Sequence, residues 1–429
     1  MHRMHISNDL KTMILRRKPG FTLEAAFYQS QDVFDLDLQA IFGRHWIYAG
    51  VEPDIPEPGD YFTVPVANTN IVVVRDDDMS IRAFHNVCRH RGAKLCDGFK
   101  GSVGNIVCPY HQWTYDLQGN LIHNEHMGEN FDRSQHGLKK VHVGNIAGLL
   151  FICLSDEPPA DFVAMKAEME PYIAPHQIAN CKVAYQEDLI ENGNWKVTME
   201  NNRECYHCKA NHPELTISIY EFGFGYQPNP ENSAELKAFN ELIKREHSRW
   251  ETCGLPSVER EFLDSRVTGY RTERLPLDKA GESQTMDAKV ACKKLLGAFT
   301  ARNLGGLSFW TQPNSWHHFM SDHIVTFSVL PVDPGHTLLR TRWLVHKDAV
   351  EGQDYNVKDL TTVWHETNKQ DGALVERSHQ GMLNSAYVPG PYSPFTEELV
   401  EKFISWYVKR LRSETGLSTV GIASAMPAE

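Results

Sequence analysis

The chain lacks the features that mark membrane proteins and nucleic-acid-binding proteins. Its longest apolar run covers residues 146–154 and is interrupted by Gly148, whereas a membrane-spanning helix needs about 20 apolar residues. Lysine and arginine (43 residues) are outnumbered by acidic residues (55) and form no dense basic stretch that would suit nucleic acid. The first residues lack the apolar segment of a secretory signal. We therefore expect a soluble, cytoplasmic protein with neither a membrane nor a nucleic-acid partner.

The cysteines do not follow the spacing of a disulfide framework. The nine cysteines are an odd number at irregular spacings, whereas disulfide frameworks use even numbers at regular spacings. We therefore expect reduced thiols, as in other cytoplasmic proteins. Internal repeats and low-complexity blocks are also missing, and 429 residues are enough for two or three domains.

Two short segments concentrate metal-ligating side chains. Cys88-Arg-His90 and Cys108-Pro-Tyr-His111 each pair one cysteine with one histidine. If one iron takes both sulfurs and the other takes both nitrogens, these side chains hold a Rieske [2Fe–2S] cluster. The same ligand types can hold structural zinc, but zinc sites more often group Cys with Cys and His with His. The arrangement therefore favours a Rieske cluster, with structural zinc as the alternative.

A second concentration lies at residues 200–213, where two histidines and two glutamates occur in a segment that begins as a helix. Non-haem iron that activates oxygen is commonly held by two histidines and one carboxylate. His207 and His212 are five residues apart, which separates them by about 140° on an ideal helix. Pro213 disfavours the helical conformation of the residue before it. We therefore expect the helix to end near Asn211 and His212 to turn back toward His207.

Spacing alone does not identify the third ligand of such a site. A predicted helix at 358–381 offers Asp371 and Glu376, and Glu366 also stays open as a candidate, although most acids on such helices face solvent. Cys205-Tyr-His-Cys208 also forms a CxxC motif, which is typical of zinc or redox sites. No second CxxC lies nearby to complete a zinc site, so we expect these two thiols to pack against a sheet.

The pattern of apolar residues divides the chain into four parts. Residues 1–44 are predicted to form a helical segment that packs on the catalytic domain, with helical spacing at 31–43. Residues 45–157 contain short strand-like runs separated by turn residues. Residues 158–415 mix helices with strands, and the tail at 416–429 is expected to be flexible. The predicted fold is α+β: an N-terminal all-β Rieske [2Fe–2S] domain, then a catalytic domain with an antiparallel sheet flanked by helices.

Individual elements are predicted from the same periodicities. In the first domain, strands are expected at 61–66, 71–74, 81–85, 106–107 and 149–154. In the second domain, helices are expected at 160–173, 194–212, 232–250, 358–381 and 395–413. Strands are expected there at 183–192, 306–312, 323–331 and 337–346.

These residues resemble the Rieske non-haem iron oxygenases, the catalytic α subunits of ring-hydroxylating systems. The resemblance rests on Arg91-Gly92, Gln112-Trp113, Gln380-Gly381 and the stretch from Asn202 to Pro213. It implies a [2Fe–2S] cluster on Cys88, His90, Cys108 and His111. It also implies a mononuclear Fe(II) on His207, His212 and Asp371, and so names the carboxylate that spacing leaves open.

The resemblance also implies partners. Subunits of such enzymes form a homotrimer in which a carboxylate links a cluster histidine of one subunit to an iron-ligating histidine of its neighbour. Here that carboxylate is Glu204, between His111 and His207, and its hydrogen bonds would orient both imidazoles. A separate flavin- or ferredoxin-type reductase is expected to supply electrons from NAD(P)H.

Within this family, the chain is similar to betaine demethylases, which act on glycine betaine or on stachydrine (proline betaine). The matching stretches are 200–207, 343–352 and 386–393. The implied reaction uses O2 to hydroxylate an N-methyl group of glycine betaine, and the product then releases formaldehyde. Stachydrine, other N-methylated zwitterions, aromatic ring dihydroxylation and a Rieske electron carrier are the alternatives.

Recognition of a quaternary ammonium group requires aromatic faces, since the group has no N–H to donate. The candidates in the second half of the chain are Phe309, Trp310 and Trp316. His317, where the resemblance leads us to expect asparagine, is the candidate partner for the substrate carboxylate.

Overall fold

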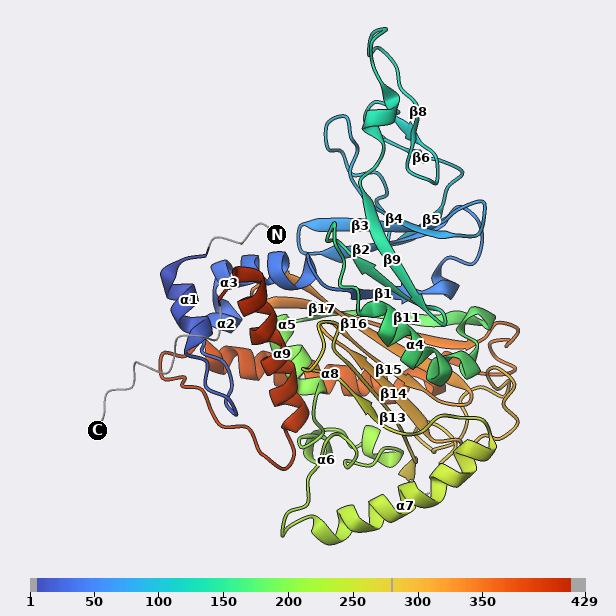
Figure 1. Cartoon of the computed structure of the whole chain (residues 1–429). Helices are drawn as coiled ribbons and strands as arrows, with labels where there is room; N and C mark the ends of the chain where they lie inside the picture. The colour runs from blue at the N-terminus through green and yellow to red at the C-terminus, as the bar shows by residue number, and fades with distance from the viewer. Residues whose placement is uncertain (1–5, 279–280, 418–429) are drawn as a thin grey trace.

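The computed structural model describes residues 6–278 and 281–417, which form a β domain, a larger α+β domain and a helical N-terminal segment (Figure 1). Of the tail predicted at 416–429, only residues 416 and 417 are among those described. Within the described ranges, no helix has both the length and the apolar character to cross a membrane.

The N-terminal segment is helical and packs beside the last helix of the chain. α1 (Asn8–Leu15), α2 (Ala26–Gln29) and α3 (Gln31–Asp37) are followed by the π-helical turn η1 (Leu38–Phe42). α9 (Glu398–Thr415) contacts α1 and η1 (Figure 1). The buried Asp37 carboxylate accepts hydrogen bonds from Trp195, Lys196 and Tyr407, which tie this segment to the larger domain.

The first domain is built from antiparallel sheets, as predicted. Its main sheet has seven strands in the order β1-β10-β9-β4-β3-β2-β5, and its small sheet has the order β6-β7-β8. The described residues 45–157 hold no α-helix. The strands are β1 (Ile47–Val51), β2 (Asp60–Val66), β3 (Thr69–Arg75), β4 (Ile81–His85), β5 (Lys100–Ser102), β6 (Ile106–Val107), β7 (Thr114–Tyr115), β8 (Leu121–His123), β9 (Lys140–Ile146) and β10 (Leu149–Cys153).

The second domain contains one seven-stranded antiparallel sheet with helices around it. The strand order is β11-β17-β16-β15-β14-β13-β12. The strands are β11 (Cys181–Glu191), β12 (Arg260–Glu261), β13 (Tyr270–Leu275), β14 (Gly306–Thr311), β15 (Ser315–Phe319), β16 (His323–Asp333) and β17 (His336–His346). The helices are α4 (Phe162–Ile173), α5 (Trp195–Asn202), α6 (Cys208–Asn211), α7 (Ser233–Thr252) and α8 (Val357–Met382). The predicted α+β class is therefore confirmed.

The two faces of this sheet have different neighbours. Trp310 pairs across strands with Trp316, and this face also presents His318, whose ring stacks on Trp364 of α8 at 4.6 Å. The opposite face presents Phe309, which packs in one cluster with Phe151 of β10. One face of the sheet therefore contacts α8, and the other contacts the first domain.

A buried ion pair joins the two domains. Arg342 of β17 and Asp54 of the 3-10 turn Glu52–Asp54 are both fully buried at their side chains, with Nε and Oδ2 3.0 Å apart. A buried charge needs such a partner, because the free energy of desolvation is several kcal/mol per ion. The contact therefore fixes how the β domain sits on the sheet.

The observed elements differ from the predicted ones at several positions, and β1, β5, β7, β8, β9 and β12 are among the strands that were not predicted. The helix predicted at 194–212 is divided into α5, which ends at Asn202, and the short α6, which begins at Cys208. β13 and β15 were not predicted, because their apolar residues alternate with histidine, arginine and serine that are nonetheless buried. Burial of polar side chains on a covered sheet face hides the period-two pattern.

Candidate metal centres

The two Cys–His segments of the first domain form loops of the same kind. Cys88 donates its N–H to the carbonyl of Ala93 and accepts at its own carbonyl from Gly92. Cys108 makes the equivalent hydrogen bonds with Trp113 and Gln112. Both loops therefore return the chain over five residues and point one cysteine and one histidine outward from a rigid β scaffold. The fourth residue after each cysteine has a positive φ, +77° at Gly92 and +57° at Gln112.

The four side chains converge as a Rieske cluster requires. The rings of His90 and His111 lie 4.7 Å apart, and Cys88 and Cys108 are 4% and 1% exposed. Nδ1 of His90 is buried without a hydrogen-bond partner. Two buried sulfurs and two adjacent imidazoles with an unsatisfied nitrogen suit a [2Fe–2S] cluster bound through both atom types.

Two aromatic residues support these ligands. The indole of Trp113 stacks on the ring of His90 at 4.8 Å and 7°. The hydroxyl of Tyr115 lies 3.4 Å from the sulfur of Cys88 and accepts the N–H of Arg89. Hydrogen bonds to the sulfurs are one of the means by which proteins set the potential of such clusters. Tyr115 was not predicted, and only its position in β7 brings it to the cluster.

The mononuclear centre is assembled from His207 and His212, at the two ends of α6, and from Asp371 of α8. Oδ1 of Asp371 lies 3.3 Å from Nε2 of His207 and 3.0 Å from Nε2 of His212. Metal–ligand bonds of about 2.1 Å at right angles place neighbouring donor atoms about 3.0 Å apart. Nε2 of His212 and Oδ1 of Asp371 are also buried without hydrogen-bond partners. The three side chains therefore fit one metal ion on a common face, with further positions open.

The local sequence explains how the two histidines meet. α5 ends at Asn202, and the Glu204 carboxylate then accepts the backbone N–H groups of Tyr206 and His207. α6 ends at Asn211, before Pro213, as predicted. The rings of His207 and His212 consequently stand 5.0 Å apart and nearly perpendicular.

Each imidazole is oriented from its other nitrogen. Nδ1 of His207 donates to Glu204 at 2.5 Å, and Nδ1 of His212 donates to Gln370 Oε1 at 2.8 Å. The Gln370 amide in turn donates to Glu214 at 2.7 Å. Because Glu214 only accepts hydrogen bonds, the amide nitrogen faces Glu214 and the amide oxygen faces His212. Both rings therefore present a bare Nε2 to the metal. Gln370 and Glu214 were not predicted from the sequence.

The electrostatics of the centre favour a cation. Burial lowers the pKa of His207, but the Asp371 and Glu204 carboxylates beside the ring outweigh burial and raise the pKa to about 10. Burial raises the pKa of Asp371, but the adjacent His207 and His212 imidazoles outweigh it and lower the pKa. Two carboxylates thus stabilise positive charge between two imidazoles, which is the charge a divalent metal supplies.

The other acidic candidates lie away from the centre. Glu376 accepts a hydrogen bond from Gln380 on the exposed part of α8, and Glu366 lies beside Lys369. Asp371 alone of the three approaches the histidines in the described part of the chain.

The structure corrects two expectations about side chains. Cys205 and Cys208 form a disulfide, whereas we expected reduced thiols. His317 contacts Tyr48 of β1 at 4.5 Å between ring centroids, on the sheet face opposite Trp316, and Phe309 shares that face. His317 and Phe309 therefore face away from α8 and Asp371, while Trp310 and Trp316 face toward them.

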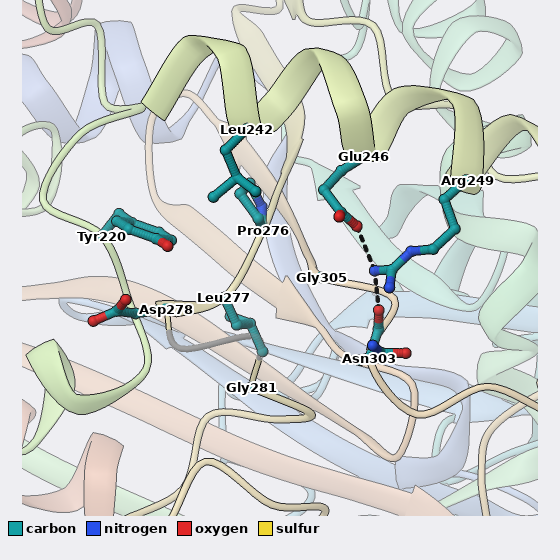
Figure 2. A pocket seen from close by; sticks show the side chains of 10 residues that line it. All are labelled: Tyr220, Leu242, Glu246, Arg249, Pro276, Leu277, Asp278, Gly281, Asn303 and Gly305. Atoms are coloured by element: carbon teal, nitrogen blue, oxygen red, sulfur yellow. Dashed lines mark hydrogen bonds and ion pairs between the residues drawn. The ribbon is translucent and has the colours of Figure 1, made fainter. Parts of the chain in front are cut away.

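Two pockets lie near this part of the domain. One, of about 270 Å³, opens beside Glu204 and His207 and is lined by residues of α5, α8 and α9. The other, of about 210 Å³, lies under α7, where Arg249 points between Glu246 and Asn303 (Figure 2). The second pocket includes none of the metal-ligand candidates, and the first includes His207 but neither His212 nor Asp371.

The chain matches known proteins along nearly its whole length. Residues 45–142 match the Rieske [2Fe-2S] domain family, and residues 178–413 match the ring hydroxylating alpha subunit (catalytic domain) family. It is 42% identical to a glycine betaine monooxygenase oxygenase subunit from Chromohalobacter salexigens, covering 94% of this chain and 88% of that one. It is 41% identical to the glycine betaine monooxygenase oxygenase subunit of Pseudomonas aeruginosa strain UCBPP-PA14, covering 94% and 92%.

A solved structure shows the same fold. The quaternary ammonium Rieske monooxygenase CntA in complex with L-carnitine superposes with a TM-score of 0.68 at 21% identity, covering 96% of this chain and 99% of that chain.

Proposed function

The chain belongs to the Rieske ring-hydroxylating oxygenase α subunits, and on this premise we propose that it N-demethylates a quaternary ammonium betaine, with glycine betaine favoured. O2 is the co-substrate, and formaldehyde is the second product. The observation that carries the proposal is the 40–42% identity with glycine betaine monooxygenase oxygenase subunits over 94% of the chain. Electrons come from a separate NAD(P)H-dependent reductase, and the reaction takes place in the cytoplasm.

The cofactors are a Rieske [2Fe–2S] cluster and a mononuclear non-haem iron, as in the rest of the family. We assign the cluster to Cys88, His90, Cys108 and His111, and the iron to His207, His212 and Asp371. When bound, the iron supplies oxygen activation at its open positions. The chain's own contribution is to hold both imidazoles by their Nδ1 atoms and to present a partly covered pocket beside them.

The substrate cation is expected to bind the aromatic face of the sheet that contacts α8. Trp310 and Trp316 lie on this face, but the ring of Trp310 already stacks on Phe224 and is flanked by the guanidinium groups of Arg203 and Arg271, so Trp316 is the candidate. A quaternary ammonium over such a ring is stabilised by about 0.5–2 kcal/mol. Asp371 belongs to the same face of α8 as Trp364, which stacks on His318 beside Trp316.

We also propose that Glu204 connects two subunits of a homotrimer. His111 is exposed, and Tyr110 beside it is 56% exposed under the exposed Arg91, so the tip of the cluster domain offers a contact surface that carries positive charge. Tyr206 is 65% exposed beside Glu204, which already holds His207. Docking of His111 of one subunit onto Glu204 of the next would complete the path between cluster and iron.

Formaldehyde release from a panel of methylated amines tests the substrate. Glycine betaine should give stoichiometric formaldehyde and dimethylglycine, and stachydrine and carnitine should give less. The matched control is 3,3-dimethylbutyrate, which has the shape of glycine betaine without its positive charge. It should compete weakly with glycine betaine, because an uncharged tert-butyl group is not attracted electrostatically to the face of an aromatic ring. Equal inhibition by this analogue would contradict recognition through aromatic faces, and absence of formaldehyde with every betaine would contradict the proposed reaction.

Replacement of Glu204 with glutamine tests the link between subunits. The variant should keep both metals and its oligomeric state while turnover falls by about 10–100-fold, the scale of losing a partner that orients metal ligands. Reduction of the mononuclear site by the cluster, followed in a single turnover, should slow to the same extent. Near-normal turnover would contradict the role of Glu204.

A further inference from the structure

The disulfide between Cys205 and Cys208 encloses a metal-ligand candidate. Its two cysteines flank Tyr206 and His207, and both are buried, at 2% and 3% exposure. The sulfur of Cys208 lies within 4.8 Å of a ring nitrogen of both His207 and His212. We propose that Cys205 and Cys208 are a redox-active pair whose disulfide keeps the Cys208 sulfur off the mononuclear metal. Reduction of the pair then brings a thiolate within reach of that metal.

The distances support a competing ligand. A tetrahedral zinc ion with Zn–S and Zn–N bonds of about 2.3 and 2.1 Å requires sulfur and nitrogen about 3.6 Å apart. The Cys208 sulfur is therefore at most about 1.2 Å beyond this distance from a ring nitrogen of each histidine. Rotation about the Cα–Cβ bond of a free cysteine moves its sulfur further than this. The bond to Cys205 prevents that rotation.

The chemistry of the ligand explains why the state of the pair matters. Two histidines and Asp371 leave positions open on the metal, as oxygen activation requires. A thiolate would be a fourth protein ligand, and two histidines, one carboxylate and one thiolate make a closed tetrahedral zinc site. Soft thiolate ligands also favour zinc over Fe(II). The disulfide therefore preserves an open iron site, and its reduction favours a closed zinc site.

The redox step is a thiol–disulfide exchange. A dithiol reductant breaks the Cys205–Cys208 bond, gives up two electrons and two protons, and becomes a disulfide itself. Intracellular disulfides in mesophiles are usually redox-sensing rather than structural, which suits a pair at a metal centre. The exposed Tyr206 lies between the two cysteines and offers the approach to the buried bond.

The state of the pair is tested by differential labelling of the native holoenzyme. Free thiols are blocked under denaturing, non-reducing conditions, the protein is reduced, and new thiols are labelled and located by mass spectrometry. Cys205 and Cys208 should be labelled only after reduction, whereas the exposed free Cys253 is blocked at the first step. Blocking of all nine cysteines at the first step would overturn the proposal.

Metal selectivity is tested with three variants purified without oxygen and loaded with equal iron and zinc. Cys205→Ser frees the Cys208 thiol, Cys205→Ser with Cys208→Ser removes both sulfurs, and Cys253→Ser is the matched control. The zinc-to-iron ratio should rise in the first variant by about tenfold or more. Even a residue that only hydrogen-bonds to a metal ligand changes metal affinity by about this factor, and a new thiolate ligand should change it at least as much. The other two variants should match the native ratio.

The same ratio is measured on the native chain after treatment with a dithiol, so the test does not depend on the variants folding. Equal ratios before and after reduction, or in the single and double variants, would overturn the proposal. The proposal rests on the mononuclear site but not on the substrate. A chain that releases no formaldehyde can still show the shift in metal selectivity, so the two failures are distinguishable.

Discussion

The two metal centres of this chain are built in different ways. The cluster ligands lie within residues 88–111 on two loops with the same hydrogen-bond pattern, whereas the mononuclear ligands come from the two ends of α6 and from α8, more than 150 residues further along the chain. The first centre depends on local backbone geometry, and the second depends on how α8 packs across a sheet. A local centre tolerates change elsewhere in the fold, while a distributed centre responds to distant contacts.

The largest effects are expected from removing one ligand from each centre, because each substitution should empty one metal site and leave the other occupied. His207→Ala should abolish iron binding at the mononuclear site and reduce product formation to the detection limit, because a single imidazole and Asp371 make a poor site. The visible spectrum of the cluster should be unchanged. Cys108→Ser should do the reverse, with loss of the cluster spectrum and retention of one iron per chain. Iron counting and absorption spectra of both variants measure this, and loss of both metals from either variant would show that the centres depend on each other.

Gln370 tests how far the mononuclear centre depends on residues that do not touch the metal, because it acts on the metal only through His212. Gln370→Leu removes the acceptor for Nδ1 of His212, so iron affinity should fall by about 10–100-fold. Gln370→Glu combined with Glu214→Gln keeps an acceptor for Nδ1 of His212 without setting two carboxylates against each other, so this double variant should retain most of the affinity. Equilibrium competition with a chelator measures the affinities. Equal losses in both variants would contradict an orienting role for Gln370.

Most of the first centre, but less of the second, could be predicted from the sequence. The Cys–His pairs and the end of α6 before Pro213 follow from local spacing and from one proline. Asp371 could be selected only by resemblance, because Glu366 and Glu376 occupy the same helix. Gln370 and Tyr115 depend on contacts between distant segments. His317 was wrongly expected near the substrate, because the direction of a strand residue depends on register, and one step reverses it.

Removing the ion pair between the domains should make the thermal stabilities of the two centres differ. Arg342→Met leaves Asp54 buried without its partner, which should lower the free energy of unfolding by about 3–5 kcal/mol. Loss of cluster absorption and loss of tryptophan fluorescence, followed together on heating, should no longer coincide. Lys94→Met, at the exposed pair with Asp97, is the control and should change neither transition. Coincident, unshifted transitions in Arg342→Met would contradict a stabilising role for the pair.

The smallest expected effect concerns pH and Glu200, one turn before Glu204. Burial raises the pKa of Glu200 from 4.5 to about 7, although hydrogen bonds from Tyr28 and Tyr392 oppose the rise. The folded protein therefore keeps a proton that the unfolded chain loses near pH 4.5. The resulting stabilisation is complete below pH 4.5 and is lost as pH rises through 7.

Glu200→Gln cannot titrate, so its free energy of unfolding should vary less between pH 5 and 8 than that of the native chain. Denaturant titrations at four pH values measure this. The same pH dependence in both proteins would show that Glu200 does not titrate in this range. The cluster spectrum should be insensitive to the substitution, since the Glu200 carboxylate accepts its hydrogen bonds from Tyr28 of the N-terminal segment and from Tyr392, both outside the cluster domain.

α8 gives the second centre a mechanical property that the first lacks. Its 26 residues span about 39 Å as one rigid rod. Trp364 and Asn368, which touch the sheet at His318 and Thr341, share a face of this rod with Asp371. A small rotation of the rod would therefore move Trp364 and the Asp371 carboxylate together while His207, His212 and the tryptophans of the sheet stay in place, so a change in packing at His318 would reach the metal through one of its three ligands.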